Sequence, residues 1–415
     1  MKPWLTIMGV GDDGAAGLAP SLRALIDAAD IIVGSQRILE RVDIGDIETH
    51  LWTPPTEEML SQIMGWKGKN VVVLATGDPM YYGAGVTLAR HIPPGEMTII
   101  PAPSAFSLAA ARLGWPLQDV ETISLHGRPV SLLHPFVQPG GKVLALMGSG
   151  ESVHEAAKLL RARGFGQSRL TVMEHMGGPY ERIVTLSASK CGSQDFADFN
   201  TLGIECIAGA KADIQPRVPG LADEAFTHDG QLTKREVRSI TLAALAPAPG
   251  ALLWDVGAGC GSVAIEWMRA ANGAQAIAFE QNQARVKMIA ENAVALGAPG
   301  LEVVAGDVHK TLDDSTSPDA VFLGGAVTSD GVFKTCWRAL IPRGRLVANA
   351  VTLEGEAALI ARHAAHGGEL VRIDISHVGR IGTRRALRPR PAARRAPRPG
   401  RGPRARRIRR CRGRR

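Results

Sequence analysis

The stretch LLWDVGAGCGS, residues 252–262, says more about the fold than any other part of this sequence. An apolar run ends at Asp255, glycines then alternate with small residues, and a helical pattern, VAIEWMRAA (263–271), follows. A buried strand that runs into a glycine-rich loop and then a helix is typical of α/β proteins. Such proteins bind nucleotide-like ligands at the carboxyl ends of their strands. The stretch therefore predicts an α/β domain with a ligand site, preceded by about 250 residues of other sequence.

The spacing of these glycines favours one kind of ligand. A dinucleotide fingerprint, G-x-G-x-x-G, would place its third glycine at position 262, which is Ser262. The observed D-x-G-x-G-x-G resembles motif I of the class I, Rossmann-like S-adenosylmethionine methyltransferases. S-adenosylmethionine carries no phosphate, so the loop need not direct a helix N-terminus at one. Glycines let the backbone approach such a ligand closely. The residues expected to bind S-adenosylmethionine here are Gly257, Ala258, Gly259, Cys260 and Gly261.

Two carboxylates follow the next two predicted strands. Glu280 ends AIAFE, where it is expected to accept the ribose hydroxyls, and Asp307 ends LEVVAGD beside Val308, where both would face the adenine. The alternative is that these acids are helix N-caps or solvated turn residues. A nicotinamide oxidoreductase is a second alternative, which Ser262 disfavours. The strand DAVFLGGAV (319–327) lacks the Asp/Asn-Pro-Pro-aromatic tetrapeptide often found in enzymes that methylate nucleobase amines.

Strand and helix patterns alternate along nearly the whole chain, which predicts an α/β protein with mostly parallel strands. A length of 415 residues is too great for one ordinary core. We expect a first domain over 1–208, a linker over 209–229 and a second domain over 230–383. The remaining residues, 384–415, form an arginine- and proline-rich tail that is predicted to be disordered.

The first half carries an ordered series of distinctive turns. They read TIMGVGDDG (6–14), VVLATGDPMYYGAG (72–85), IPAPSAFSLAAARLGWP (100–116) and VMEHMGGPYERI (172–183). This series resembles the tetrapyrrole (precorrin) methylases, a second methyltransferase fold, in which two α/β subdomains hold S-adenosylmethionine between them. A plain turn would explain any one of these segments, but the ordered set favours the family.

The residues of these turns suit a ligand cleft. Gly77 allows an unusual backbone angle, and Pro79 fixes a bend directly after Asp78. Ser104 and Ala105 stand at a predicted helix start, where a hydroxyl can donate and a small side chain leaves room. The resemblance implies that these five residues bind the cofactor, and that Gly9 and Gly11 face the macrocyclic substrate.

The second half adds a further resemblance. QLTKREVRSITLAAL (231–245) followed by the glycine loop resembles the class I methyltransferases of the same pathway, in which the threonine equivalent to Thr233 lies over S-adenosylmethionine. Together the two halves, over 1–383, resemble the fused precorrin methyltransferases of cobalamin (vitamin B12) biosynthesis. That family implies methylation of a precorrin at C5 and C15 with decarboxylation of the C12 acetate. Two donor sites on one chain would serve two methyl groups.

Such a substrate carries several carboxylates, which arginine and lysine bind well. Arg37, Arg128 and Arg235 are therefore candidate substrate-binding residues, with Lys234 and Arg238 as further candidates; the alternative for each is an ordinary solvated charge. Methyl transfer depends mainly on holding two reactants in line, so we expect no catalytic triad and no metal. His126 and His175 lie beside motif loops and are interpreted as structural, and no general acid or base can be assigned.

The tail dominates the charge. Residues 388–415 hold fourteen arginines and no acid, so without them the net charge of +8 becomes −6. A class I methyltransferase sheet normally ends with an antiparallel seventh strand, and the tail has five prolines and few apolar residues where that strand should be. We favour a reading-frame shift near residue 380. A genuine basic arm, making the chain an RNA- or DNA-binding methyltransferase, is the alternative.

The remaining features predict an ordinary intracellular enzyme. The sequence has no apolar run of 18 residues, and its start, MKPWLTIMGVG, lacks the pattern of a signal peptide. Its five cysteines are scattered without a C-x-x-C pair, which is typical of reduced thiols. We expect a cytoplasmic homo-oligomer whose partner is a precorrin, with neither nucleic acid nor membrane as partner.

Overall fold

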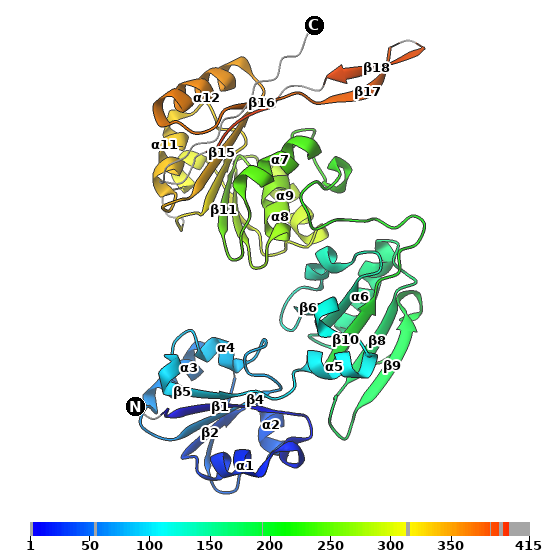
Figure 1. Ribbon diagram of the computed structural model, residues 1–415, viewed down its shortest axis with the longest axis vertical. Helices are drawn as coiled ribbons and strands as arrows, with labels where there is room; N and C mark the ends of the chain where they lie inside the picture. The colour runs from blue at the N-terminus through cyan, green and yellow to red at the C-terminus, as the bar shows by residue number, and fades with distance from the viewer. Residues whose placement is uncertain are drawn as a thin grey trace. The chain divides into compact units, whose positions relative to one another are not determined.

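The computed structural model describes residues 3–53, 56–192, 194–312, 316–381, 383–389 and 393–397. The chain divides into two compact units. The colours of Figure 1 follow the residue number from the N-terminus to the C-terminus. Unit 1 comprises Met1–Val130 and Phe136–Ile214, and unit 2 comprises Ser131–Pro135 and Gln215–Arg415. The change of unit after Ile214 falls inside the segment 209–229, whose exact extent as a linker stays a prediction.

Part of that segment is packed against unit 2. Leu221 and Phe226 are buried in the core of unit 2, and Thr227 donates its backbone N–H to Asn292 at 2.8 Å. The backbone carbonyls of Gln215 and Pro216 accept hydrogen bonds from the Arg269 guanidinium. Residues 215–227 thus contribute to the stability of unit 2 as well as connecting the units.

The first sheet of unit 1 is wholly parallel, with strand order β3-β2-β4-β1-β5. Leu5 and Ile7 of β1 belong to one core cluster, while Met8 and Val10 belong to another on the opposite face. Burial on both faces is what a parallel sheet covered by helices requires. The elements are β1 (Leu5–Val10), α1 (Pro20–Asp27), β2 (Ile31–Gly34), α2 (Gln36–Arg41), β3 (Glu48–Leu51), α3 (Thr56–Gly65), β4 (Val71–Thr76), α4 (Ala84–Leu88) and β5 (Met97–Ile100).

The second sheet of unit 1 has the order β6-β7-β10-β8-β9 and is mixed. Only β6 and β7 pair in parallel, so the prediction of mostly parallel strands is wrong for this sheet. The connection from β8 to β9 is too short for a crossover, which forces these strands to be antiparallel. The elements are α5 (Ala105–Leu113), β6 (Glu121–Ser124), β7 (Lys142–Leu146), α6 (Gly150–Ala162), β8 (Arg169–Glu174), β9 (Arg182–Ser187) and β10 (Asn200–Glu205).

Unit 2 is built on a seven-stranded sheet of order β13-β12-β11-β14-β15-β19-β16, whose first five strands are parallel. Leu253 of β11 packs in the core on one face, and Trp254 and Val256 pack in the core on the other. The elements are α7 (Arg235–Leu245), β11 (Leu252–Val256), α8 (Ser262–Ala270), β12 (Gln275–Glu280), α9 (Gln283–Ala295), β13 (Glu302–Ala305), α10 (Val308–Thr311), β14 (Ala320–Leu323), α11 (Asp330–Ala339), β15 (Arg345–Ala350), α12 (Leu353–His366) and β16 (Val371–Ile373).

The C-terminal part of unit 2 departs from the sequence prediction. The expected single last strand is divided into β16 and β17 (Ser376–Ile381), and β17 forms a hairpin with β18 (Arg384–Pro389). β19 (Ala393–Pro397) lies antiparallel between β15 and β16, the position of the seventh strand that the tail was predicted to lack. Strands β18 and β19 can form here because backbone ladders need no apolar residues, and Pro389 and Pro397 stand only at strand ends. The disorder expected for the tail as a whole stays a prediction. Residues 398–415 lie outside the described residues.

Shorter features complete the fold. Short 3-10 helices occur at Gly14–Gly17, Pro94–Glu96, Leu117–Asp119, Val130–Phe136, Ala188–Lys190 and Asp223–Ala225. Across the described ranges, no helix has both the length and the apolar character needed to span a bilayer. Cys191, Cys206, Cys260 and Cys336 are free, buried thiols, and Cys411 lies outside the described residues.

Candidate functional sites

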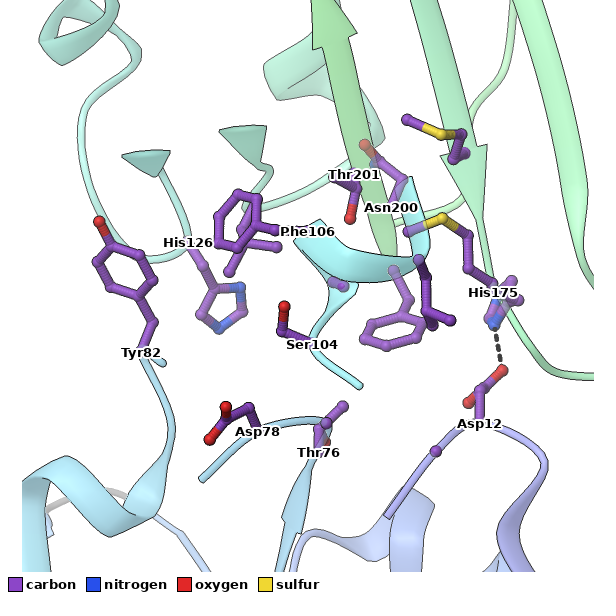
Figure 2. A pocket seen from close by; sticks show the side chains of 18 of the residues that line it. Asp12, Thr76, Asp78, Tyr82, Ser104, Phe106, His126, His175, Asn200 and Thr201 are labelled. Carbon is purple, nitrogen blue, oxygen red and sulfur yellow. Dashed lines mark ion pairs between the residues drawn. The ribbon is translucent and has the colours of Figure 1, made fainter. Parts of the chain in front are cut away.

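Unit 1 contains a cavity of about 500 Å³ at the carboxyl ends of β1 and β4. The start of α5, the loop at His126 and the ends of β7, β8 and β10 complete its walls (Figure 2). Ligands of open α/β sheets bind at the carboxyl ends of parallel strands, and this volume suits a small molecule. The cavity thus joins the two sheets of unit 1 in one site.

Six of the residues predicted from the sequence line this cavity. They are Gly11, Arg37, Gly77, Asp78, Ser104 and Ala105. Gly9, Pro79 and Arg128 do not line it. The turns that the sequence singled out therefore meet around one space, although not every residue in them reaches it.

Gly9 has a packing role instead of the predicted place facing substrate. A Cβ atom on Gly9 would lie 2.2 Å from the Gly77 carbonyl oxygen and 2.6 Å from the Ala102 nitrogen. Gly77 itself has φ +63°, and its N–H donates to the Val10 carbonyl at 2.9 Å. Glycine at position 9 therefore lets the ends of β1 and β4 and the segment before α5 come together.

The wall around α5 combines a helix cap with aromatic residues. The Ser104 hydroxyl accepts a hydrogen bond from the Ser107 N–H at 3.1 Å, so Ser104 caps α5 as well as lining the cavity. Tyr82 packs near Phe106 and has φ +59°, which is rare for a residue with a side chain. Burial raises the pKa of Tyr82, Tyr81 raises it further, and the nearby Arg128 opposes the change.

A buried carboxylate that the sequence analysis missed stands at the end of β1. Asp12 is only 6% exposed. Its carboxylate lies 3.1 Å from Nη1 of Arg37, 2.9 Å from Nη1 of Arg41 and 3.5 Å from Nδ1 of His175. The only signal in the sequence was a pair of acids directly after a buried strand.

Arg37 is largely committed to this cluster. Its guanidinium also donates to the Thr76 hydroxyl at 3.3 Å and lies 3.3 Å from the centroid of the Phe199 ring. Burial lowers the pKa of Arg37, and the negative charge of Asp12 opposes that shift. Because Arg37 lines the cavity, one side of the guanidinium can still face a bound molecule.

In unit 2 the glycine loop after β11 has the conformation that its sequence requires. Gly257, Gly259 and Gly261 have φ values of +73°, +61° and +80°. A Cβ on Gly257 would lie 3.0 Å from the Gly325 nitrogen, so the loop passes close to the end of β14. Cys260 is buried in the core, which leaves only its backbone, with that of Ala258, available to a ligand at this loop.

Glu280 fastens the glycine loop to β12. One carboxylate oxygen accepts from the Gly259 N–H at 2.9 Å, and the other accepts from the Asn282 N–H at 3.0 Å. Glu280 is 5% exposed, and each oxygen retains a further lone pair for a ligand hydroxyl. The position of Glu280 agrees with both interpretations, a turn residue and a ribose acceptor. Asp307 is exposed just after β13, and Val308, partly buried, begins α10.

Asp255 contacts the protein backbone. Its carboxylate accepts a hydrogen bond from the Ala264 N–H at 3.0 Å at the start of α8, and it is 1% exposed. Burial raises the pKa of Asp255 to about 7, in spite of the opposing hydrogen bond and with a further contribution from Glu280. The aspartate of the motif therefore holds α8 against β11.

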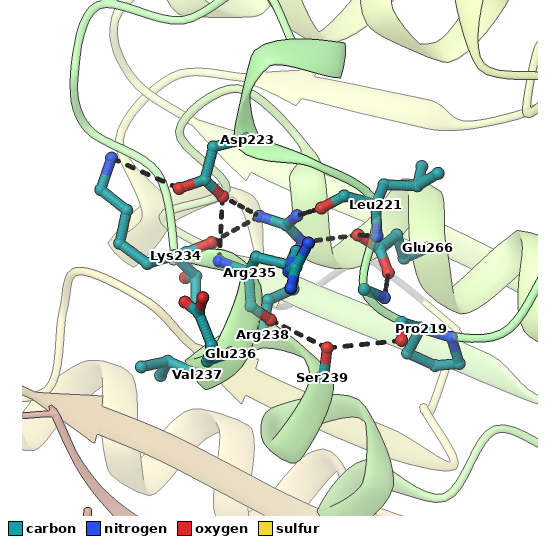
Figure 3. A network of polar contacts seen from close by, with 12 residues as sticks. Pro219, Leu221, Asp223, Lys234, Arg235, Glu236, Val237, Arg238, Ser239 and Glu266 are labelled. Carbon is teal, nitrogen blue, oxygen red and sulfur yellow. Dashed lines mark hydrogen bonds and ion pairs between the residues drawn. The ribbon is translucent and has the colours of Figure 1, made fainter. Parts of the chain in front are cut away.

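Arg238 is unavailable to a substrate. Its side chain is fully buried, with Nε 2.5 Å from the Glu266 carboxylate and Nη1 3.3 Å from the Asp223 carboxylate (Figure 3). It also donates to the carbonyl oxygens of Thr233, at 2.6 Å, and Leu221. The interpretation of Arg238 as a substrate ligand is therefore wrong, because its donors all serve internal acceptors.

The neighbours of Arg238 are better placed. Arg235 is exposed and joins the network through its backbone: its N–H donates to Asp223 at 2.9 Å, and its carbonyl oxygen accepts from the Ser239 hydroxyl at 2.8 Å. Lys234 is half-buried, with Nζ 3.8 Å from Asp223. Thr233, two residues before α7, accepts a hydrogen bond from Arg238 through its carbonyl oxygen. Arg235 thus remains a candidate for contact with substrate.

Two family profiles match the chain. Residues 5–191 match the tetrapyrrole (corrin/porphyrin) methylases, and residues 224–394 match the precorrin methyltransferase domain. Precorrin-6Y C(5,15)-methyltransferase (decarboxylating) of Sinorhizobium sp is 47% identical over 383 residues, which are 92% of this chain and 93% of that protein.

Relatives that span only part of the chain are also found. Cobalt-precorrin-7 C(5)-methyltransferase of Salmonella typhimurium is 33% identical and covers 45% of this chain and 91% of its own length. Cobalt-precorrin-6B C(15)-methyltransferase (decarboxylating) of the same organism is 29% identical over 41% of this chain and 90% of its own length. The crystal structure of the C-terminal domain of precorrin-6Y C5,15-methyltransferase from Rhodobacter capsulatus is 42% identical, covers 45% of this chain and all of that one, and has a TM-score of 0.42.

A tetrapyrrole methylase unit with a cavity, followed by a glycine-loop unit on a separate α/β sheet, defines a fused two-unit methyltransferase. The long relative covers nearly the whole of both units. The chain belongs to the family of decarboxylating precorrin-6Y C5,15-methyltransferases, enzymes of cobalamin biosynthesis.

Proposed function

We propose that the chain methylates a precorrin at C5 in unit 1 and at C15 in unit 2, and that unit 2 removes the C12 acetate carboxyl as carbon dioxide. The relative named for C5 has about the length of the tetrapyrrole methylase match, and the relative named for C15 and decarboxylation is similar in length to unit 2. The observation that carries the proposal is that each unit has its own set of ligand-type turns, one around a cavity and one at a glycine loop.

S-adenosylmethionine fits both sets as the methyl donor. In unit 2 the three left-handed glycines leave a bare backbone beside the buried Glu280 carboxylate, which suits a ribose. Asp307, Val308 and Thr233 would complete that site. In unit 1 Gly77, Asp78, Ser104 and Ala105 would hold the donor, with Gly11 toward the macrocycle. When bound, the donor supplies an electrophilic methyl group.

The chain's own contribution is mainly positional. Aligning a ring carbon with a methyl group can lower the activation barrier by up to about 7–11 kcal/mol, because the reaction then has a high effective molarity. The walls of the unit 1 cavity come from both sheets of that unit. The folding of unit 1 therefore fixes the relative positions of these walls before any ligand enters. Burial of the acetate in unit 2 would favour its loss, because the conjugated ring accepts the electrons.

Arg235 and Arg128 are the candidates that keep exposed side chains for substrate carboxylates. Arg37 contributes through the side of its guanidinium that lines the cavity. These roles are testable by substitution with methionine, which keeps the aliphatic bulk and removes the charge. We expect a raised KM for the precorrin with little change in donor affinity.

The reaction is tested with purified protein, precorrin-6B and methyl-labelled S-adenosylmethionine. Mass spectrometry should show the gain of two methyl groups and the loss of one carbon dioxide. Gly77→Val should abolish C5 methylation alone, because a β-branched residue cannot adopt φ +63° without strain. Glu280→Ala should abolish C15 methylation and decarboxylation alone. Gly95→Ala, at an open position, is the control. A product with no added methyl groups would overturn the proposal.

We also propose a homo-oligomer with neither nucleic acid nor membrane as partner. On the β17–β18 hairpin, Val378 and Leu387 face each other in register and are 67% and 71% exposed. Paired exposed apolar side chains on a two-stranded ribbon favour burial against another copy. Light scattering on the intact protein should give a multiple of 44.0 kDa, and Val378→Glu should reduce it.

A further inference from the structure

Methylation at C5 leaves a proton that some group must accept, and this inference rests on the function proposed for unit 1. A bridging ring carbon carries one hydrogen and uses a pair of ring π electrons to form the new C–C bond. The electrons of the broken S–C bond remain on sulfur. Conjugation returns only when the C–H electrons re-enter the ring and the hydrogen leaves as a proton. The site therefore needs a base beside that carbon.

The carboxylates that line the cavity are already engaged. Asp78 accepts from the Met80 N–H at 2.8 Å, and Asp198 accepts from the Gly150 N–H at 3.0 Å. Asp12 is paired with two arginines, Arg37 and Arg41. Each of these carboxylates therefore already holds a loop or a neighbouring side chain in place. Two histidines, His126 and His175, remain in the cavity wall.

His175 has the arrangement of an oriented base. Its Nδ1 is buried 3.5 Å from the Asp12 carboxylate and makes no hydrogen bond to any described residue. Its ring is 24% exposed and lines the cavity, where Figure 2 shows it directed at Asp12. Such separations shorten when substrate binds. If Nδ1 carries the proton and faces Asp12, then Nε2 carries the lone pair.

The backbone around His175 is shaped for this contact. His175 has φ +46°, a strained value for a residue with a side chain, and strain of this kind concentrates at functional sites. A Cβ on Gly178, in the same turn, would lie 2.4 Å from the Asp12 carboxylate, so the turn fits closely over Asp12. His126 is exposed, and no carboxylate contact is found for it within the described part of the chain.

We propose that His175 accepts the proton from the methylated C5 carbon through Nε2, and that Asp12 is its positioning residue. Asp12 stabilises the imidazolium that forms, and Arg37 and Arg41 keep Asp12 in place. Water receives the proton afterwards through the exposed part of the ring.

The left-handed backbone gives a sharp test. Glycine adopts φ +46° without strain, so His175→Gly should keep the fold and leave a space the size of an imidazole ring. We expect the rate of C5 methylation to fall about 10²–10⁴-fold, with C15 methylation unchanged, and added imidazole to restore much of it. His175→Asn fills the space without supplying a base. Its rate of C5 methylation should fall by the same factor, and added imidazole should not restore it. His91→Asn, on an exposed histidine outside the cavity, should match the wild type.

Two measurements separate a chemical role from a structural one. Calorimetry with S-adenosylhomocysteine should show unchanged affinity in unit 1 of the glycine variant. In spectra of ¹⁵N-histidine-labelled protein, the His175 Nδ1 signal is identified by its absence from His175→Asn. Asp12→Asn should shift that signal.

Several results would overturn the proposal. They are retention of C5 methylation within threefold in His175→Gly, loss of donor binding without imidazole rescue, or a His175 signal unaffected by Asp12→Asn. A wild-type chain that places no methyl on C5 would end the proposed function as well, whereas failure of rescue alone ends only this one.

Discussion

At the scale of single residues, the acidic residues of the unit 2 motifs stabilise the fold itself. Asp255 secures α8, and Glu280 secures the glycine loop. Both carboxylates lie at the ends of parallel strands, where backbone N–H groups of the following loops are within reach. A residue of a ligand-type motif can therefore make its hydrogen bonds to the protein backbone, and its role toward a ligand stays a prediction.

The buried Asp255 makes stability depend on pH. Its pKa is about 7 in the folded protein and about 3.9 when unfolded, so between these values the unfolded chain has lost a proton that the folded chain keeps. Its contribution to stability therefore falls as pH rises, by about 1.4 kcal/mol per unit, and levels off above pH 7. Denaturant unfolding of wild type and Asp255→Asn at pH 5 and pH 8 should show a smaller decrease in the variant. Equal decreases would contradict the assignment.

Arg238 provides a second prediction at this scale. Removing it leaves Glu266, which is 2% exposed, without its ion-pair partner, and breaking a buried pair typically costs about 3–5 kcal/mol. Arg238→Met should therefore lower the free energy of unfolding of unit 2 by several kcal/mol. The matched control is Arg235→Met, three residues away and exposed, which should change it by less than about 0.5 kcal/mol. Similar small effects in both variants would show that the pair is dispensable.

At the scale of elements, the cavity of unit 1 depends on how closely three chain segments approach one another. Gly9→Ala would place a Cβ against backbone atoms at 2.2 and 2.6 Å, which cannot be relieved by rotating a side chain. We expect a loss of at least about 2 kcal/mol of stability and at least tenfold weaker donor binding in unit 1. Gly95→Ala meets no atom within 4 Å and should leave both unchanged. Urea unfolding and calorimetry measure the two quantities.

The strand β19 decides how much of the tail unit 2 needs. It is hydrogen-bonded to β15 on one side and β16 on the other, so ending the chain after residue 389 removes two backbone ladders. We expect that truncation to lower the melting temperature of unit 2, while ending the chain after residue 397 leaves it unchanged. An unchanged melting temperature after the truncation at residue 389 would favour the frameshift interpretation, in which these residues have no place in the sheet.

At the scale of the whole molecule, each unit has its own core clusters and its own set of ligand-type turns. Two independent sites predict that S-adenosylhomocysteine binds with a stoichiometry of two per chain. Gly77→Val and Glu280→Ala should each reduce this to one, and the double variant to zero. Calorimetry on the intact protein gives the count directly. A stoichiometry of one in the wild type would mean that only one unit binds the donor.

Much of this molecule could be predicted from local pattern. Alternation of apolar residues located the strands, and the left-handed conformation of Gly257, Gly259 and Gly261 follows from their being glycines. Arg238 was misjudged because burial is not visible in a helical stretch that carries several charges. β19 was missed because it is held by backbone pairing between two strands, which leaves little trace in side chains.

The sequence by itself determined the two α/β units, the family and the turns that surround the cavity, because these depend on residues that are close along the chain. Only the tertiary structure decided which of those residues reach open space. Gly9 allows close packing, Arg238 forms a buried ion pair, and Asp12 lies beside His175, which is 163 residues further along the chain. Contacts between distant segments are fixed by burial and strand pairing, and these arise only when the whole unit has folded.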